Sequence, residues 1–150
     1  TDPAIIVLVE HGNRALFGRK AEWPAHRYST IAGFVEPGES AEQAVVREVA
    51  EETGVEVIES CYHSSQPWPF PSSLMLGYSA HAGRSQIHLN DRELEKAKWL
   101  SRQELTDQLV CGEFLPPTPI SISFRLIEDW FNRQSVVPFR VWCENNIFQD

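Results

Sequence analysis

The sequence predicts an α+β fold in which helices cover a mixed β-sheet. Short apolar runs rich in β-branched residues alternate with stretches of helical periodicity, and turn residues separate them. The strand-like runs precede, interrupt and follow two main helical stretches, residues 40–53 and 121–132. This order is typical of a mixed sheet with helices packed against it. A length of 150 residues leaves room for one domain, with at most a short tail.

The strands are predicted from apolar content and alternation. The first run begins at Ala4 and stops at Gly12-Asn13, a pair typical of a tight turn between strands. The other runs expected to form strands are residues 15–17, 28–34, 55–61, 74–81, 87–89 and 97–100. Residues 65–73 carry three prolines in alternation, which exclude a central strand because each proline removes a backbone donor.

The first helix has clear signals at both ends. Ser40 and Gln43 form a capping box, apolar residues follow at helical spacing, and Gly54 is a typical residue just beyond a helix C-terminus. A helix is therefore predicted over residues 40–53.

Later elements are marked less evenly. Ser101 and Glu104 form a second capping box that begins a short helix. Residues 121–132 have a largely helical apolar pattern, whereas the residues from Gln134 onward fit no clear element. We expect one domain over residues 1–134 and a C-terminal extension of unknown role over residues 135–150.

The composition argues against several classes of protein. Thirteen Lys and Arg against 21 Asp and Glu leave a net charge of −8, which excludes nucleic-acid binding through a generally basic surface. No apolar run approaches the ~20 residues that span a bilayer, and the first residues lack the pattern of a signal peptide. Three scattered cysteines predict neither a disulfide framework nor a zinc site within this chain. A cytoplasmic protein without a membrane partner is expected.

Three carboxylates gather on one face of the first helix. Glu48, Glu51 and Glu52 fall within a sector of about 100°, for which a solvated charged face is the ordinary interpretation. Ala44 and Val45 share that sector, so we expect the acids to point toward the body of the protein. Like charges at these spacings cost roughly 0.2–0.5 kcal/mol per pair, a cost that a bound divalent cation would remove. Oxygen ligands favour Mg²⁺ or Mn²⁺ over zinc.

Residues 33–55, GFVEPGESAEQAVVREVAEETGV, resemble the Nudix box. The box has the pattern G-x5-E-x7-R-E-U-x-E-E-x-G-U, in which U is apolar. The sequence matches every specified position, namely Gly33, Glu39, Arg47, Glu48, Val49, Glu51, Glu52, Gly54 and Val55. The resemblance implies a Nudix α/β/α sandwich and divalent-metal hydrolysis of a nucleoside diphosphate linked to another moiety.

The same resemblance implies roles for individual residues. The expected ligands of Mg²⁺ or Mn²⁺ are four carboxylates and one backbone carbonyl: Glu48, Glu51, Glu52, Glu93 and Ala32. A surface acid among charged neighbours is the alternative reading of Glu93. Arg47 is expected to orient the acids by ion pairing. Either Glu51 or Glu52 is expected to accept the proton of the attacking water, and the sequence does not separate them.

A second motif, SQPWPFPSS, follows the box. Its prolines hold Trp68 and Phe70 in place at little entropic cost, which suits either a flat heterocyclic ligand or the protein core. The segment resembles the signature of NADH pyrophosphatases, the Nudix branch that also removes NAD caps from RNA. That resemblance implies a dinucleotide site lined by Gln66, Pro67, Trp68, Pro69, Phe70, Pro71, Ser72 and Ser73, with Phe34 stacking on the nicotinamide and a backbone contact from Ser123.

The function expected from both motifs is hydrolysis of NADH or NAD⁺ to NMN(H) and AMP, with NAD-capped RNA 5′ ends as a further substrate. The alternatives are a Nudix hydrolase of ADP-ribose or diadenosine polyphosphate, and a non-catalytic nucleotide-binding module. A homodimer is expected from the family. The family usually carries a four-cysteine zinc ribbon ahead of the domain, so we expect an excised domain or a ribbonless variant, and the start at an apolar strand favours excision.

Overall fold

The computed structural model describes residues 1–89 and 93–148. Within these residues it contains a six-stranded sheet and four helices. The strands are β1 (Asp2–His11), β2 (Arg14–Arg19), β3 (Ile31–Phe34), β4 (Val57–Trp68), β5 (Ser73–Ala82) and β6 (Lys96–Ser101). The helices are α1 (Ala41–Thr53), α2 (Arg102–Cys111), α3 (Ile122–Asn132) and α4 (Phe139–Asn146).

The sheet is mixed, as the sequence predicts. The strand order is β4-β5-β1-β2-β6, and β1 pairs in parallel with β5, whereas the other pairs are antiparallel. One edge of β1 serves two partners: Ala4–Val7 pair with β3, and Glu10 and His11 pair with β2. Because β2 and β3 take different parts of the same edge, the sheet divides between them.

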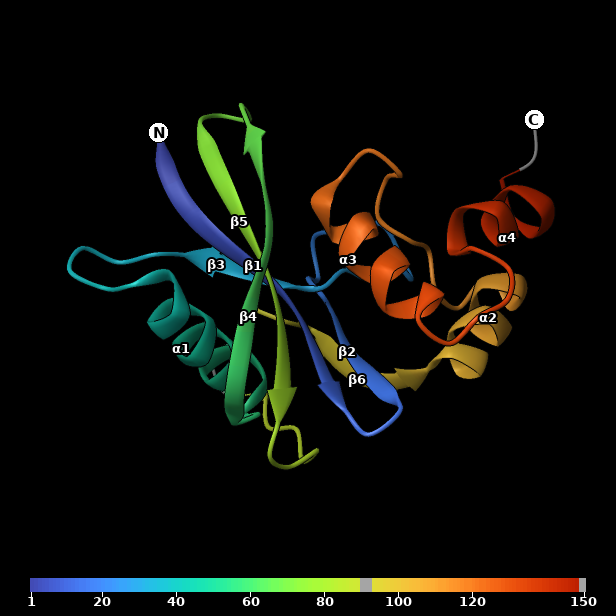
Figure 1. The fold of residues 1–150 in the computed structure, drawn as a ribbon, viewed down its shortest axis with the longest axis horizontal. Helices are drawn as coiled ribbons and strands as arrows, with labels where there is room; N and C mark the ends of the chain where they lie inside the picture. The colour runs from blue at the N-terminus through green and yellow to red at the C-terminus, as the bar shows by residue number, and fades with distance from the viewer. Residues whose placement is uncertain (90–92, 149–150) are drawn as a thin grey trace.

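Alternation along β1 separates two cores, one on each face of the sheet. Ile5, Val7 and Val9 pack against the apolar side chains of α1. Ile6 and Leu8 pack on the other face, in the core that contains buried residues of α2, α3 and α4. Figure 1 shows α1 on one side of the strands and α2, α3 and α4 on the other. The predicted sandwich is therefore confirmed.

The predicted capping signals operate as expected. The Ser40 side chain accepts from the Gln43 amide, the Gln43 side chain accepts from the Ser40 amide, and Gly54 ends α1 with a left-handed φ of 73°. Ser101 and Glu104 make the same reciprocal contacts at the start of α2, which runs further than the short helix expected from its first residues. None of the helices in the described part of the chain combines the length and apolarity that crossing a bilayer requires.

Two expectations about secondary structure are wrong. Residues 87–89 form no strand; instead the His88 amide bonds to the carbonyl of Thr53, at the end of α1. The chain after Gln134 contains α4, whose Phe139 and Cys143 are fully buried in the core beside α3. The α4 sequence hides this role, since only two of its eight residues are buried.

The first part of the proline-punctuated segment belongs to β4, not to a separate unpaired stretch. Gln66, Pro67 and Trp68 pair with Met75, Leu74 and Ser73 of β5. The expected exclusion from a central position holds, because β4 is an edge strand of the sheet. An edge position tolerates proline, since one side of the strand lacks a partner that would need its N–H.

Candidate active site

Three carboxylates meet beside α1. Glu48 and Glu52 lie one turn apart on the helix, and Glu93 approaches from the segment before β6. One oxygen from each lies within 4.8 Å of the others. Glu48 is only 9% exposed and Glu52 only 1%, so these two acids point inward, as the shared apolar sector predicts. Glu93 is exposed.

Gly33 makes room for this group. A Cβ atom at Gly33 would lie 2.1 Å from Cδ of Glu48, which is far inside van der Waals contact. Only a glycine therefore lets the β3 backbone approach the carboxylate this closely. Ala32, the residue expected to offer a carbonyl, is the neighbour of Gly33 in β3.

Glu51 does not belong to the inward group that Glu48, Glu52 and Glu93 form. Its side chain is 53% exposed and accepts from Nη1 of Arg47 at 3.2 Å. The sequence predicts that Glu48, Glu51 and Glu52 meet around one ion; in the structure Glu51 lies apart from the other two and pairs with Arg47, and its part in binding an ion stays a prediction. Glu51 lies at one margin of the helix sector that the three acids share. The rest of the protein covers the side of that sector on which Glu48 and Glu52 lie.

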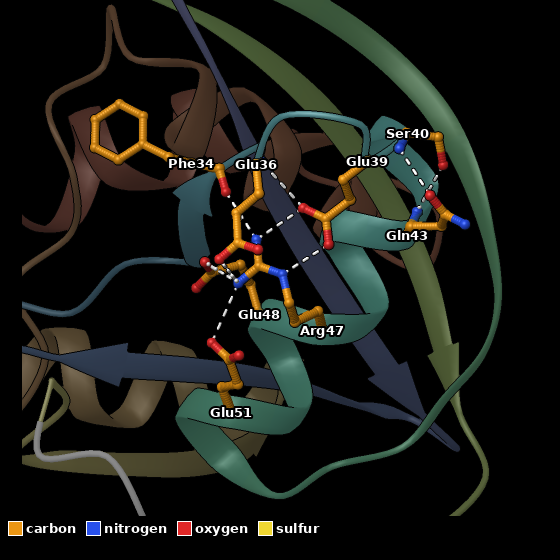
Figure 2. Close-up of polar contacts among 8 residues, drawn as sticks. All are labelled: Phe34, Glu36, Glu39, Ser40, Gln43, Arg47, Glu48 and Glu51. Carbon is orange, nitrogen blue, oxygen red and sulfur yellow. Dashed lines mark hydrogen bonds and ion pairs between the residues drawn. The ribbon is translucent and has the colours of Figure 1, made fainter.

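Arg47 organises the residues around the cluster (Figure 2). Its Nε and Nη2 donate to the two oxygens of Glu39 at 2.7 and 2.8 Å, and Nη2 also donates to the Phe34 carbonyl at 2.9 Å. Nη1 donates to Glu48 at 2.8 Å. One guanidinium thus joins β3, the loop before α1 and two helical acids, in the fork geometry that lysine cannot reproduce.

The electrostatics follow from these contacts. Hydrogen bonds from Arg47 lower the pKa of Glu39 to about 2, and the contact with Glu39 raises the pKa of Arg47. Burial raises the pKa of Glu48, although Arg47 opposes this effect. Glu39 and Arg47 are therefore a stable ion pair. In the protein without a cation, burial disfavours the ionised form of Glu48.

The cluster fits a divalent cation. Two unit charges about 4 Å apart repel by roughly 4 kcal/mol near a protein surface, so ionised carboxylates this close need a compensating charge. The donors are hard oxygens, which is the ligand set of Mg²⁺, Ca²⁺ and Mn²⁺, and Gly33 clears the space beside them. Glu48, Glu52 and Glu93 are the residues that would hold the ion.

A pocket of about 470 Å³ lies on the opposite face of the sheet. Ile6 and Met75 form its floor, and the start of α3 together with residues 117–118 forms one wall. Trp68, Trp23 and Tyr28 supply aromatic surface. A pocket of this size, mostly apolar with a few polar groups, is typical of a small-molecule site.

Two of the predicted substrate residues line this pocket but already have protein partners. The Gln66 side chain donates to the Ile120 carbonyl and accepts from the Ile122 amide, both at the start of α3. Ser123 is 4% exposed, and its hydroxyl bonds to Ser29 and Thr30. Both side chains therefore help to form the walls of the pocket. Because the Ser123 hydroxyl is already bonded, only its backbone could make the substrate contact that the sequence analysis expects.

The remaining predicted residues lie around the pocket, outside its lining. The Phe70 ring is 73% exposed and stands edge-on to Trp68, with centroids 5.5 Å apart. Phe34 is 59% exposed, and Figure 2 shows its ring directed away from Arg47. The turn between β4 and β5 and the first residue of β5 contain Pro69, Pro71, Ser72 and Ser73. The Asp2 amide bonds to the Ser72 carbonyl, which ties this turn to β1.

Sequence reasoning missed one side of the pocket. Trp23, Arg27 and Tyr28 line it, although the sequence analysis assigns none of them to the site. One signal was present: Trp23-Pro24 repeats the tryptophan-proline pairing of Trp68-Pro69, in which the proline restricts the backbone of the tryptophan before it.

Known proteins resemble the chain in sequence and in fold. A family model described as NUDIX domain matches residues 1–116. The chain is 44% identical over 135 residues to NAD-capped RNA hydrolase NUDT12 of Macaca fascicularis, covering 86% of this chain and 29% of that protein. It is 42% identical over 139 residues to NAD-capped RNA hydrolase NudC of Mycobacterium bovis (strain BCG / Pasteur 1173P2), covering 86% of this chain and 44% of that protein.

A crystal structure of a NUDIX hydrolase from Nitrosomonas europaea has the same fold. It superposes with a TM-score of 0.71 at 17% identity, covering 89% of this chain and 71% of that one. The chain spans less than half the length of the two curated relatives. Since the family model matches more than half of the chain, including the box and the edge strand with its tryptophan, the chain belongs to the NUDIX domain family.

Proposed function

We propose that the chain hydrolyses the pyrophosphate bond of NADH or NAD⁺, giving NMN(H) and AMP, with a divalent cation as cofactor. The single observation that carries this proposal is the position of β3 between the two sites. Gly33 lies against the Glu48 carboxylate on the α1 face. The next residue, Phe34, shares a cross-strand row with Met75 and Gln66 on the pocket face. A dinucleotide lying across β3 would place one base near the pocket and its pyrophosphate near the acids.

Names of relatives support this substrate class. Two proteins that share more than 40% identity with the chain are described as NAD-capped RNA hydrolases. Trp68 supplies a flat surface in the pocket, and base–aromatic stacking contributes about 1–3 kcal/mol per base. We extend the proposal to NAD-capped RNA 5′ ends. Because the net charge of −8 gives no general attraction to the RNA backbone, we propose that the chain recognises the NAD cap and not the rest of the RNA.

We propose Mg²⁺ or Mn²⁺ as the cation, held by Glu48, Glu52 and Glu93 with the Ala32 carbonyl. When bound, such ions neutralise the charge that develops on pyrophosphate oxygens during an in-line displacement. Arg47 fixes the orientation of Glu48 relative to β3. Glu51, which lies outside the inward cluster and faces solvent, accepts the proton of the attacking water.

The second candidate function is hydrolysis of ADP-ribose or diadenosine polyphosphate by the same acids. It predicts that activity survives loss of Trp68. A non-catalytic nucleotide-binding module is the third, and the presence of Glu48, Glu51 and Glu52 together argues against it.

Chromatography of products from NADH, ADP-ribose and diadenosine polyphosphates, with and without Mg²⁺, tests the proposal. We expect AMP from NADH, much less product from the other substrates, and none without the cation. Equal turnover of ADP-ribose would replace the proposal by its second candidate, and binding without turnover would support the third.

We also propose a reducing, cytoplasmic setting and a homodimer, and we keep the expected domain boundary near residue 134 as a prediction to be tested against the burial of Phe139 and Cys143 in the core. Free Cys61 and Cys111 on the surface are consistent with a reducing compartment. Light scattering across a concentration series tests the dimer. Deletion of residues 135–150 tests the boundary, and a large fall in Tm would place α4 inside the domain.

A further inference from the structure

Arg19, the last residue of β2, is a buried cation outside the cluster described above. It is 7% exposed and uses all three of its guanidinium nitrogens. Nε donates to Glu95 at 2.8 Å. Nη1 donates to the carbonyls of Pro24 and Arg27, at 2.9 and 3.4 Å, and Nη2 donates to the carbonyl of Trp23 at 3.4 Å.

One side of Arg19 holds the segment that carries Glu93. The Arg19 carbonyl accepts from the Glu95 amide at 2.8 Å, so side chain and backbone link the two residues twice. Leu94, between the two acids, is 7% exposed, and a Cβ atom at Gly18 would lie 2.9 Å from its Cδ1. Leu94 and Glu95 thus pack against the end of β2, and Glu93 directly precedes these two anchored residues.

The other side of Arg19 holds the wall of the pocket. The three carbonyls it binds belong to residues 23–27, and Trp23 and Arg27 line the pocket. His26, within this loop, has a φ of 65°, an unfavourable backbone conformation for a residue with a side chain. Such conformations persist where surrounding contacts over-determine them. Arg19 and the Leu115 amide, which bonds to the His26 carbonyl, are those contacts.

We propose that Arg19 is a positioning residue that couples the two halves of the site: it holds Glu93 in reach of the cation and holds Trp23 and Arg27 against the substrate. This inference rests on the proposed function. The guanidinium of Arg19 affects the cation affinity through its bond to Glu95, and it affects the substrate affinity through its bonds to the carbonyls of residues 23–27. Outer-shell partners of metal ligands typically change metal affinity by about 10–100-fold when removed.

The two sets of bonds can be cut separately. Glu95→Gln weakens the link to the Glu93 segment and leaves the three carbonyl contacts in place. Arg19→Lys keeps the charge but loses the planar fork that reaches all four acceptors. Arg14→Gln is the matched control, since Arg14 is on the same strand and pairs with Glu104 on the surface.

The experiment measures two affinities in the absence of turnover. Mn²⁺ binding is followed by electron paramagnetic resonance without substrate, and NADH binding is followed by fluorescence in EDTA. We expect Arg19→Lys to weaken both by about tenfold or more. We expect Glu95→Gln to weaken Mn²⁺ binding alone, and Arg14→Gln to change neither. Circular dichroism and Tm verify that each variant is folded.

Folded Arg19→Lys with both affinities unchanged would overturn the proposal, as would equal weakening of NADH binding by Glu95→Gln. If Arg19→Lys fails to fold, Glu95→Gln decides, because Glu95 is 43% exposed and its loss leaves the core intact; unchanged Mn²⁺ binding there would overturn the coupling. Failure of the wild-type chain to bind or cleave NADH would refute the proposed function instead, and the Mn²⁺ measurements would still test the link between Arg19 and Glu93.

Discussion

The two faces of the sheet carry sites built in different ways. On the α1 face, Gly33, Glu48 and Glu52 come from one continuous stretch of 20 residues, and only Glu93 arrives from elsewhere. On the α3 face, the pocket lining runs from Ile6 to Ser123 and draws on three strands, two loops and a helix. A contiguous site depends on the geometry of one helix, whereas an assembled site depends on the whole fold.

The difference extends to what holds each site in place. Glu48 is held by Arg47, which also binds Glu39 and the Phe34 carbonyl, and all of these contacts lie within residues 34–48. The pocket is fixed by neutral side-chain bonds between distant segments, such as those of Gln66 with the start of α3. We therefore expect changes on the α1 face to alter turnover and cation binding, and changes on the α3 face to alter substrate affinity.

We expect the largest loss of activity from substitution of Glu52, in the inward cluster, and of Glu51, outside it. Glu52→Gln should reduce kcat by about 10²–10⁴-fold and also weaken Mn²⁺ binding, because Glu52 lies in the cluster. Glu51→Gln should reduce kcat in the same range while Mn²⁺ binding is kept. Glu56→Gln, an exposed acid beyond the helix, serves as the control. Unchanged turnover of Glu52→Gln would remove the proposed mechanism, and equal loss of Mn²⁺ binding in both variants would return Glu51 to the cluster.

Gly33→Ala tests whether the α1 face depends on local space. The new Cβ would collide with the Glu48 carboxylate and displace it, so kcat and Mn²⁺ affinity should fall by about 10–100-fold. Gly83→Ala, whose new Cβ would lie 3.1 Å from Cγ2 of the exposed Ile58, is the matched control. Normal Mn²⁺ binding by folded Gly33→Ala would contradict the close approach of β3 to Glu48.

Trp68→Ala sharpens the contrast from the other face. Loss of a stacking surface worth about 1–3 kcal/mol should raise KM for NADH by roughly 5–150-fold while kcat is largely kept. Tyr62→Ala, which removes an exposed aromatic residue from the same strand outside the pocket, should leave KM unchanged. A fall in kcat with constant KM would show that the two faces are not separable in this way.

The smallest effect concerns pH. Arg47 lowers the pKa of Glu39 from its ordinary value of 4.5 to about 2, so the ionised form is favoured by folding. The stabilisation is complete above the unfolded pKa and is lost as the pH falls from about 4.5 toward 2. Glu39→Gln should therefore lower Tm at pH 7 and converge with the wild type at low pH.

Glu36→Gln is the control for that measurement, since the Glu36 carboxylate is 3.7 Å from Arg47 and 64% exposed. A Tm difference between Glu39→Gln and wild type that stayed constant down to pH 2 would contradict the ion pair as its source.

Much of the acidic site could be predicted because its signals are local. Capping residues, helical spacing and the box all lie within residues 33–55, and helical geometry converts sequence distance into direction. The sequence did not show that Glu51 lies further out than Glu48 and Glu52, since a sector of about 100° is too wide to tell an inward carboxylate from one at its margin. Glu93 could be named only by resemblance, because no local pattern connects it to α1.

The pocket and α4 show the opposite case. Trp23 and Arg27 line the same pocket as Trp68, although about 40 residues separate them in the sequence. Phe139 and Cys143 are buried in the core only because α4 packs beside α3.

By itself, the sequence determined the alternation of strands and helices, the first helix and the carboxylates that could bind a cation, since each depends on residues a few positions apart. The tertiary structure alone decided which acids meet, that Gln66 and Ser123 are bonded to other segments, and that Arg19 bonds both to Glu95 and to the carbonyls of residues 23–27. Those outcomes depend on how strands far apart in the chain are paired, and pairing leaves no periodic trace within any one segment.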